Sequence, residues 1–206
     1  MVYNKLDLGV GCGGNKEMYR GRVYFMNKLN LSVRDLCGIG IFSALIVIMS
    51  QISIPMPYGV PMTMQTFAVP LAGMLLGVKK GTISTVVYLL LGAVGLPVFA
   101  GFTGGIGILF GMTGGFLLSF PLMALAAGAG EAAKRRIWLV AGLVAGAAIN
   151  FVCGMLWFSV VMSSSLATAF AACVLPFIPT GVVKIVLVAV LGAQIKKVMV
   201  KSRVLL

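Results

Sequence analysis

Histidine is absent from the 206-residue sequence. This absence excludes histidine metal ligands, Ser-His and Cys-His catalysis, and proton relays built on histidine. The four cysteines share no CxxC spacing, so neither a disulfide framework nor a cysteine metal site is expected. The sequence also lacks a GxxxxGK[ST] phosphate-binding loop and a βαβ setting for a dinucleotide fingerprint. We therefore expect no catalytic residue, no metal ion and no cofactor bound by this chain.

Acidic residues are also scarce: Asp7, Glu17, Asp35 and Glu131 stand against 16 lysines and arginines, for a net charge of +12. None of the four lies inside a long apolar stretch, which argues against a proton or cation pump with an intramembrane carboxylate. The basic residues occur in short blocks between apolar runs, with no basic stripe interleaved with aromatic side chains. The excess charge therefore does not indicate a nucleic-acid-binding protein.

Apolar side chains are abundant, at 60% of the chain, well above the share in a soluble domain. A helix needs about 20 apolar residues to cross a bilayer. The sequence contains six candidate stretches, at about 36–54, 63–78, 81–97, 113–130, 137–162 and 166–195. We predict an all-α polytopic membrane protein with six transmembrane helices. Because Pro176 and Pro179 interrupt the last stretch, its continuous helix is expected to run from about Pro179 to Ile195.

The placement of charge predicts the orientation of these helices. Lysines and arginines precede the first stretch and follow the second, fourth and sixth, whereas the loops at about 55–62, 98–112 and 163–165 carry no charge. Because positive loops stay on the cytoplasmic side, both termini are predicted to be cytoplasmic. We divide the chain into a flexible cytoplasmic N-terminal extension, residues 1–33, and a single six-helix membrane domain, residues 34–203. Met26 offers an alternative start, so residues 1–25 are expected to carry no function.

Lys184 is the one charged side chain well inside an apolar stretch. A charge at the centre of a membrane helix costs about 2.5–3.5 kcal/mol, so such residues usually serve a function. No acidic residue lies at the same depth, and snorkelling toward the uncharged outer side is disfavoured. We therefore expect the counter-charge to be a ligand carboxylate or phosphate that enters from outside. Backbone N–H groups near Thr180 and Gly181, at the start of the helix, would add to such a site.

A glycine-rich stretch on the outer side, GLPVFAGFTGGIGILFGMTGGF, interleaves glycines such as Gly114 with phenylalanines such as Phe99. Its composition fits a flexible connector as well as it fits a lid over a small, mostly apolar ligand. Neutral polar side chains that would orient this ligand are few, namely Gln65, Thr66, Tyr88, Asn150 and Trp157. Each of them could instead bond a neighbouring helix, because buried polar groups need partners.

Pairs of small residues four positions apart occur at Gly40/Ala44, Gly73/Gly77 and Gly142/Gly146. Such pairs let helices approach each other closely. Most of them are expected to serve packing within the chain. The pair Gly40/Ala44, on the first apolar stretch, could alternatively dock a separate membrane subunit.

The segments VPMTMQTFAVPLAGMLLG, YLLLGAVGLPVFAGFTGGIGILFGMTGGF and LPFIPTGVVK resemble the BioY family, the biotin-binding S components of energy-coupling factor (ECF) transporters. The similarity covers about residues 36–195. It implies a subunit that captures biotin at a bacterial cell membrane, while a transmembrane coupling subunit and two ABC-type ATPases supply transport energy from ATP. By this resemblance, Gly40 and Ala44 contact the coupling subunit and Lys184 lies at the biotin site. Thr180-Gly181 stands where the family usually has Gly-Asp.

Two other functions remain open from the residues alone. A stand-alone facilitator or channel for a small organic anion would also fit uncharged, glycine-rich outer loops. An intramembrane enzyme would need Lys184 as a base beside a serine such as Ser159, because neither histidine nor a carboxylate is available at that depth.

Overall fold

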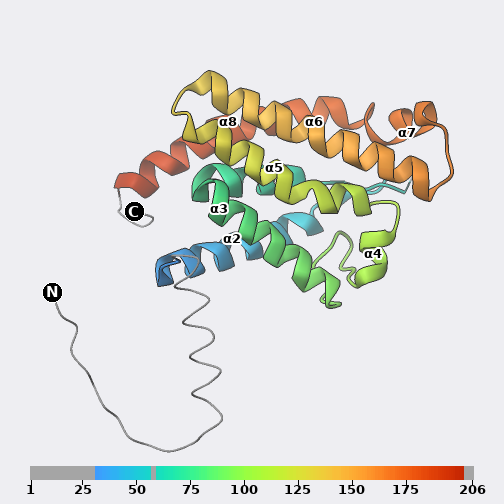
Figure 1. Cartoon of the computed structure of the whole chain (residues 1–206), viewed down its shortest axis with the longest axis horizontal. Helices are drawn as coiled ribbons and strands as arrows, with labels where there is room; N and C mark the ends of the chain where they lie inside the picture. Colours follow the sequence, from blue (N-terminus) through green and yellow to red (C-terminus); the bar gives the residue numbers. More distant parts are fainter. Residues whose placement is uncertain (1–30, 57–58, 202–206) are drawn as a thin grey trace, which may run out of the picture. The chain divides into compact units, whose positions relative to one another are not determined.

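The computed structural model describes residues 31–56 and 59–201 (Figure 1). The chain divides into two compact units, Met1–Leu36 and Cys37–Leu206. In the described part of the first unit, the Asp35 carboxylate accepts a 3.0 Å hydrogen bond from the backbone N–H of Ser32 and so caps the start of helix α2 (Val33–Gln51). The predicted N-terminal extension, residues 1–33, lies almost wholly outside the described residues.

Helices make up nearly all of the regular structure. In chain order the elements are α2 (Val33–Gln51), β1 (Ser53–Ile54), β2 (Met62–Thr63), α3 (Gln65–Ala93), α4 (Ile106–Phe110), α5 (Gly114–Ala132), α6 (Arg136–Val161), α7 (Leu166–Cys173) and α8 (Phe177–Lys201). The two short strands pair antiparallel in the connection between α2 and α3. The predicted all-α class is therefore confirmed.

Within the described residues, five helices are long and apolar enough to cross a membrane: α2, α3, α5, α6 and α8. Many of their large apolar side chains are exposed, among them Ile41, Val144 and Val186. Such outward-facing apolar side chains suit contact with lipid. In a bilayer they meet acyl chains, so their exposure does not place apolar surface in water. The chain is a multi-pass membrane protein.

Helix α3 contains both the second and the third predicted stretch. At Gly77 the backbone leaves helical geometry, with φ 80° and ψ 174°, a conformation that favours glycine. A Cβ built on Gly81 would lie 2.6 Å from the Cα of Gly73. In a straight helix, residues eight apart are separated by about 12 Å along the axis. Helix α3 is therefore two arms, about 65–76 and 78–93, that bend sharply toward each other.

The break predicted in the last apolar stretch is present, but two residues earlier than expected. Helix α7 ends at Cys173 and α8 begins at Phe177, where Pro179 had been the expected start. Pro179 sits in the first turn of α8, where its missing N–H has no helical partner to lose. The helix also continues beyond Ile195, to Lys201.

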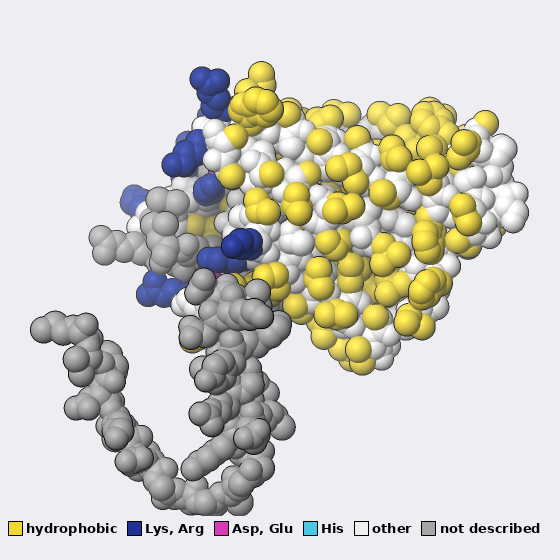
Figure 2. Space-filling view, in the orientation of Figure 1, with side chains coloured by type: hydrophobic (Ala, Val, Ile, Leu, Met, Phe, Trp, Pro, Cys, Tyr) yellow, Lys and Arg dark blue, Asp and Glu magenta, His cyan; other side chains and the backbone are white. Residues whose placement is uncertain are grey.

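Apart from the buried Lys184, the described lysines and arginines of the second unit gather at one end of the helices (Figure 2). The exposed ones lie beside the α3 break, between α5 and α6, and at the end of α8; they include Lys79, Lys134, Arg135, Arg136, Lys197 and Lys201. Helices α4 and α7 lie at the opposite end (Figure 1). The structure thus places the uncharged loops 98–112 and 163–165 at the same end of the helices, away from the exposed basic residues.

Close glycine contacts join the central helices α3, α5 and α6. A Cβ on Gly73 would lie 2.1 Å from the carbonyl oxygen of Ala124, and one on Gly142 would lie 2.5 Å from that of Ala126. Since real Cβ atoms do not approach so closely, only glycine allows these backbones to meet. Both residues belong to the predicted small-residue pairs, which here serve packing within the chain.

Candidate functional site

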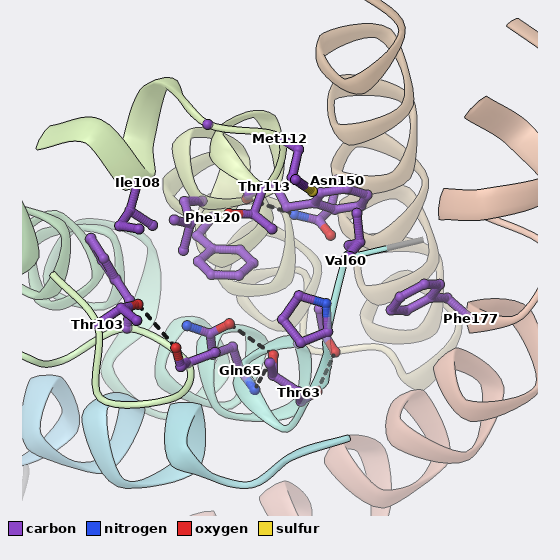
Figure 3. Close-up of a pocket in the computed structure, with 18 of the residues that line it drawn as sticks. Val60, Thr63, Gln65, Thr103, Ile108, Met112, Thr113, Phe120, Asn150 and Phe177 are labelled. Atoms are coloured by element: carbon purple, nitrogen blue, oxygen red, sulfur yellow. Dashed lines mark hydrogen bonds between the residues drawn. The ribbon is translucent and has the colours of Figure 1, made fainter. Parts of the chain in front are cut away.

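A cavity of about 340 Å³ lies among the helix ends on the uncharged side of the molecule (Figure 3). Its walls come from the loop before α3, the start of α3, the segment from Phe99 to Thr113, and α5, α6 and α8. The lining is mostly apolar and contains no charged side chain. It consists of Gly59, Val60, Pro61, Thr63, Gln65, Thr66, Phe99, Ala100, Thr103, Gly107, Ile108, Gly111, Met112, Thr113, Phe116, Leu117, Phe120, Asn150, Phe151 and Phe177.

The glycine-rich stretch forms one wall of this cavity. Gly95, Gly101 and Gly105 adopt positive φ angles of 107°, 72° and 101°, which let the chain turn back over the helices. Phe99 is 1% exposed and pairs with Thr103 across an isolated β-bridge. The stretch therefore folds into a wall over the cavity, which favours the interpretation as a lid over that as a flexible connector. Phe102 and Phe110 do not line the cavity and are mostly exposed.

A chain of polar contacts anchors the start of α3 at the cavity. The Thr63 hydroxyl donates a 2.8 Å hydrogen bond to Oε1 of Gln65, and the Gln65 amide donates to the hydroxyl of Tyr88. The Tyr88 ring packs edge-on against Phe99, with ring centroids 5.6 Å apart. Tyr88 is fully buried and supports Gln65 and Phe99 from behind, without lining the cavity itself.

Lys184, on α8, also contacts the start of α3. Its Nζ donates to the backbone carbonyl of Thr63 at 2.6 Å and to the Thr66 hydroxyl at 2.9 Å. Both acceptors are neutral, and the side chain is only 7% exposed. An ammonium has three N–H donors, so these two hydrogen bonds leave one N–H donor for a further partner. The contacts also explain how the charge is tolerated: it is solvated by oxygens from α3 and the loop before it.

A second, much smaller cavity of about 20 Å³ is lined by Lys184 and adjoins the larger one. Four residues line both cavities: Thr66, Asn150, Phe151 and Phe177. Thr180 also lines the smaller cavity, and its hydroxyl donates to the carbonyl of Phe177 at 3.1 Å. Lys184 therefore closes the deep end of the site and does not line the larger cavity directly.

Asn150 is buried in α6, with its side chain at both cavities (Figure 3). Its Nδ2 donates to the carbonyl of Phe116 at 3.0 Å and to the hydroxyl of Ser119 at 2.7 Å. Its Oδ1 is buried and has no hydrogen-bond partner. A buried acceptor without a donor costs about 1–3 kcal/mol, so this oxygen is suited to a donor carried by a ligand.

The structure brings most of the predicted site residues together. Gln65, Thr66, Phe99 and Asn150 line the larger cavity, Lys184 and Thr180 line the smaller one, and Tyr88 supports them. Gly114 lines neither cavity. A Cβ there would lie 1.8 Å from the carbonyl oxygen of Leu109, so Gly114 permits close packing between α4 and α5 and does not face a ligand.

Other cavity residues were missed in the sequence, notably Thr63, Phe120, Phe151 and Phe177. Phe120 follows Phe116 by one helical turn, so the two share a face of α5, a spacing that the sequence does show. Thr63 contributes its hydroxyl to Gln65 and its backbone carbonyl to Lys184, and no sequence pattern reveals the second contact. Phe151 and Phe177 look like ordinary apolar residues of membrane helices until α6 and α8 are placed side by side.

The predicted docking pair lies on an open face of α2. Gly40 and Ala44 are both exposed, and a Cβ built on Gly40 would meet no atom within 4 Å. Ile48, one turn further on, is 61% exposed. In contrast to Gly73 and Gly142, these small residues do not serve packing within the described part of the chain.

Comparison with known proteins adds an independent line of evidence. The sequence model of the BioY family matches residues 26–201. The chain is 39% identical over 170 residues to a protein named "Biotin transporter BioY" from Thermotoga maritima, which covers 82% of this chain and 99% of the relative. A protein of the same name from Rhodobacter capsulatus is 36% identical, with 79% of this chain and 93% of the relative covered. The fold is similar to a crystal structure of the S-component for biotin from an ECF-type ABC transporter, with TM-score 0.74, 27% identity, and coverage of 80% of this chain and 92% of that one.

Proposed function

The chain belongs to the BioY family, and we propose that it is the substrate-binding (S) subunit of an ECF transporter, which captures biotin from outside for ATP-driven uptake. The observation that carries this proposal is the shape and chemistry of the cavity. The uncharged, mostly apolar cavity of about 340 Å³ is lined by an unpaired amide oxygen, and the small cavity beside it is lined by one buried ammonium. Biotin is a monoanion with an apolar tail and a polar, neutral ureido ring, and such a ligand needs this combination of groups.

Each polar group of the site has a proposed role toward biotin. The remaining N–H of Lys184 pairs with the carboxylate, which is the only anionic group of biotin. Asn150, Gln65, Thr66 and Thr180 orient the ligand. Phe99 forms an apolar wall, and Tyr88 holds both Phe99 and Gln65 in place.

The membrane topology proposed for this function has six spans and cytoplasmic termini. The two arms of α3 each count as one span, which adds one to the five apolar helices. Basic residues lie at one end of the helices, and by the positive-inside rule this end is cytoplasmic. The cavity then opens to the outside. Residues 34–203 form the single membrane domain, and residues 1–33 a cytoplasmic extension.

The proposed partners are a transmembrane coupling subunit and two ABC-type ATPases. The exposed face around Gly40 and Ala44 on α2 supports docking of another membrane helix, because small residues let backbones approach. The chain itself carries no Walker A sequence, which agrees with ATP being hydrolysed by the partners. We assign it no enzymatic activity and no bound cofactor.

A binding isotherm with the purified full chain tests the substrate. We expect saturable binding of biotin and none of thiamine or riboflavin at the same concentrations. The methyl ester of biotin resolves which end meets Lys184, since Lys184 and Asn150 both line the smaller cavity. Weak binding of the ester places the carboxylate there, whereas binding equal to that of biotin places the ureido oxygen there. A flat titration with biotin itself would contradict the proposed substrate.

Reconstitution separates the S subunit from a stand-alone facilitator. Liposomes that hold this chain alone should take up no biotin down a gradient, and uptake should require the partner subunits and ATP. Flux through the chain alone would favour a facilitator.

A further inference from the structure

The last residue of α2, Gln51, holds the cavity wall through both ends of its side-chain amide. Its Nε2 donates to the carbonyl of Phe99 at 3.1 Å, and its Oε1 accepts from the backbone N–H of Phe102 at 2.9 Å. The neighbouring Ser50 hydroxyl donates to the carbonyl of Val98 at 2.6 Å. These contacts join positions about fifty residues apart in sequence, so they tie the end of α2 to the glycine-rich stretch.

The segment held by Gln51 forms part of the wall of the larger cavity. Phe99 and Ala100 line the larger cavity, and Phe99 also packs against Tyr88. Phe102 has a φ of 55°, in the left-handed region that a phenylalanine seldom adopts. Its ring is 73% exposed, so packing of that ring does not hold this conformation. The hydrogen bond from its N–H to Gln51 holds the backbone at this residue, inside the turn closed by the Phe99–Thr103 bridge.

Gln51 itself does not line the cavity, but it shares a helix with Gly40 and Ala44. By helical rise, Gly40 and Gln51 are about 16 Å apart along α2. A helix of this length moves as a stiff element, so a displacement at the small-residue face reaches Gln51 and, through it, the wall. For such a path to matter, α2 must prefer different positions with and without ligand.

We propose that Gln51 is a positioning residue that couples the Gly40/Ala44 face of α2 to the Phe99–Phe102 wall, so that docking on α2 controls how long the ligand is retained. This inference rests on the proposed function, because it takes biotin as the ligand and α2 as the docking helix. Coupling between two sites is reciprocal. Biotin binding must therefore change the surroundings of the α2 face, and loss of Gln51 must remove that change.

Two measurements on the purified full chain test the coupling. The first is the dissociation rate of biotin from the wild type and from Gln51→Ala, which we expect to rise about tenfold as two hydrogen bonds are lost. The second is the fluorescence of an environment-sensitive dye on Ala44→Cys, with Cys12 and Cys37 replaced by serine. We expect biotin to shift this signal when Gln51 is present and to leave it unchanged in Gln51→Ala.

Ser43→Ala is the matched control for these measurements. The Ser43 hydroxyl, also on α2, donates to the carbonyl of Ser84 at 2.8 Å but does not touch the wall. We expect this variant to keep both the wild-type dissociation rate and the dye response. Gln51→Glu keeps the acceptor for Phe102 but sets a carboxylate oxygen against the carbonyl of Phe99, so the rate should rise at least as much as in Gln51→Ala.

The inference is overturned if biotin leaves Gln51→Ala at the wild-type rate, or if the dye fails to respond in the wild type. It is also overturned if the dye responds equally in Gln51→Ala, because Gln51 would then be only a structural anchor of the loop. A wild-type chain that binds no biotin is a different result, since that outcome contradicts the proposed function itself. Thermal unfolding of the ligand-free variants shows that each is folded before the rates are compared.

Discussion

The ammonium of Lys184 donates a 2.6 Å hydrogen bond to the backbone carbonyl of Thr63. The two residues are 121 positions apart, and the contact ties α8 to the loop that precedes α3. A charge that has no acidic neighbour in sequence is thus solvated by a carbonyl and a threonine hydroxyl. The residue that closes the deep end of the cavity also fixes the start of α3, whose Gln65 and Thr66 line it.

Replacement of Lys184 by methionine tests the central contact of the site. We expect Lys184→Met to weaken biotin binding about 10- to 100-fold, because a hydrogen bond to a charged group contributes about 1.5–3 kcal/mol. The measurement is an isotherm with purified protein. Lys197→Met, on the exposed side of α8, is the matched control and should bind like the wild type. Unchanged affinity in Lys184→Met would remove this lysine from the proposed site.

Asn150→Ala should lower biotin affinity about tenfold, because the variant removes a buried acceptor at the cavity that has no hydrogen-bond partner among the described residues. Ser119→Ala serves as its control. That change removes a hydrogen bond made to the Asn150 amide but leaves Oδ1 in place. If both variants lose the same affinity, Asn150 acts through helix packing and not through contact with ligand.

Glycine contacts between helices predict a stability difference within one pair of variants. Gly73→Ala places a Cβ 2.1 Å from the carbonyl oxygen of Ala124 and should destabilise the protein by about 1–3 kcal/mol. Gly40→Ala meets no atom within 4 Å and should leave stability equal or slightly higher, since alanine favours helix. Thermal unfolding in detergent compares them. Equal melting of the two variants would show that α3 and α5 do not pack as described.

A bulky residue on α2 should separate ligand binding from transport. We expect Gly40→Trp to bind biotin like the wild type, because position 40 is exposed and remote from the cavity. ATP-driven uptake in cells that hold the partner subunits should fall at least about tenfold, since the indole blocks close helix approach. Normal uptake by this variant would place the docking surface elsewhere.

The six-span topology predicts which loops face outside. A membrane-impermeant maleimide should label Ser163→Cys in intact cells, and Lys79→Cys only after permeabilisation. Both positions are exposed in the structure, so access depends on the side of the membrane. Labelling of Lys79→Cys in intact cells would show that the α3 break does not lie on the cytoplasmic side.

Much of the architecture follows from local sequence patterns. Apolar runs of helical length identify the membrane helices, and Pro176 with Pro179 places the break before α8 to within two residues. Two short apolar stretches, at about 63–78 and 81–97, predict an interruption of the helix near Lys79 and Lys80. The sharpness of the bend within α3 depends on Gly77 and on the contact between Gly73 and Gly81, which is a property of packing.

Gly114 and Gly40 show where sequence and structure diverge for one residue type. Both are glycines in or beside apolar stretches, yet Gly114 is pressed against Leu109 and Gly40 faces open space. Whether a glycine meets a ligand, a helix or lipid depends on which backbone lies opposite. A single sequence does not contain that information.

The sequence by itself determined the membrane class, the grouping of basic residues on one side, and the presence of one lysine within an apolar stretch. These features are local, because they depend on the residue types along each segment. Only the tertiary structure decided that Thr63 and Thr66 solvate Lys184, that Asn150 keeps an unpaired oxygen, and that Gln51 holds the cavity wall. The physical reason is that these contacts join distant parts of the chain, and close packing of α3, α5, α6 and α8 sets their geometry.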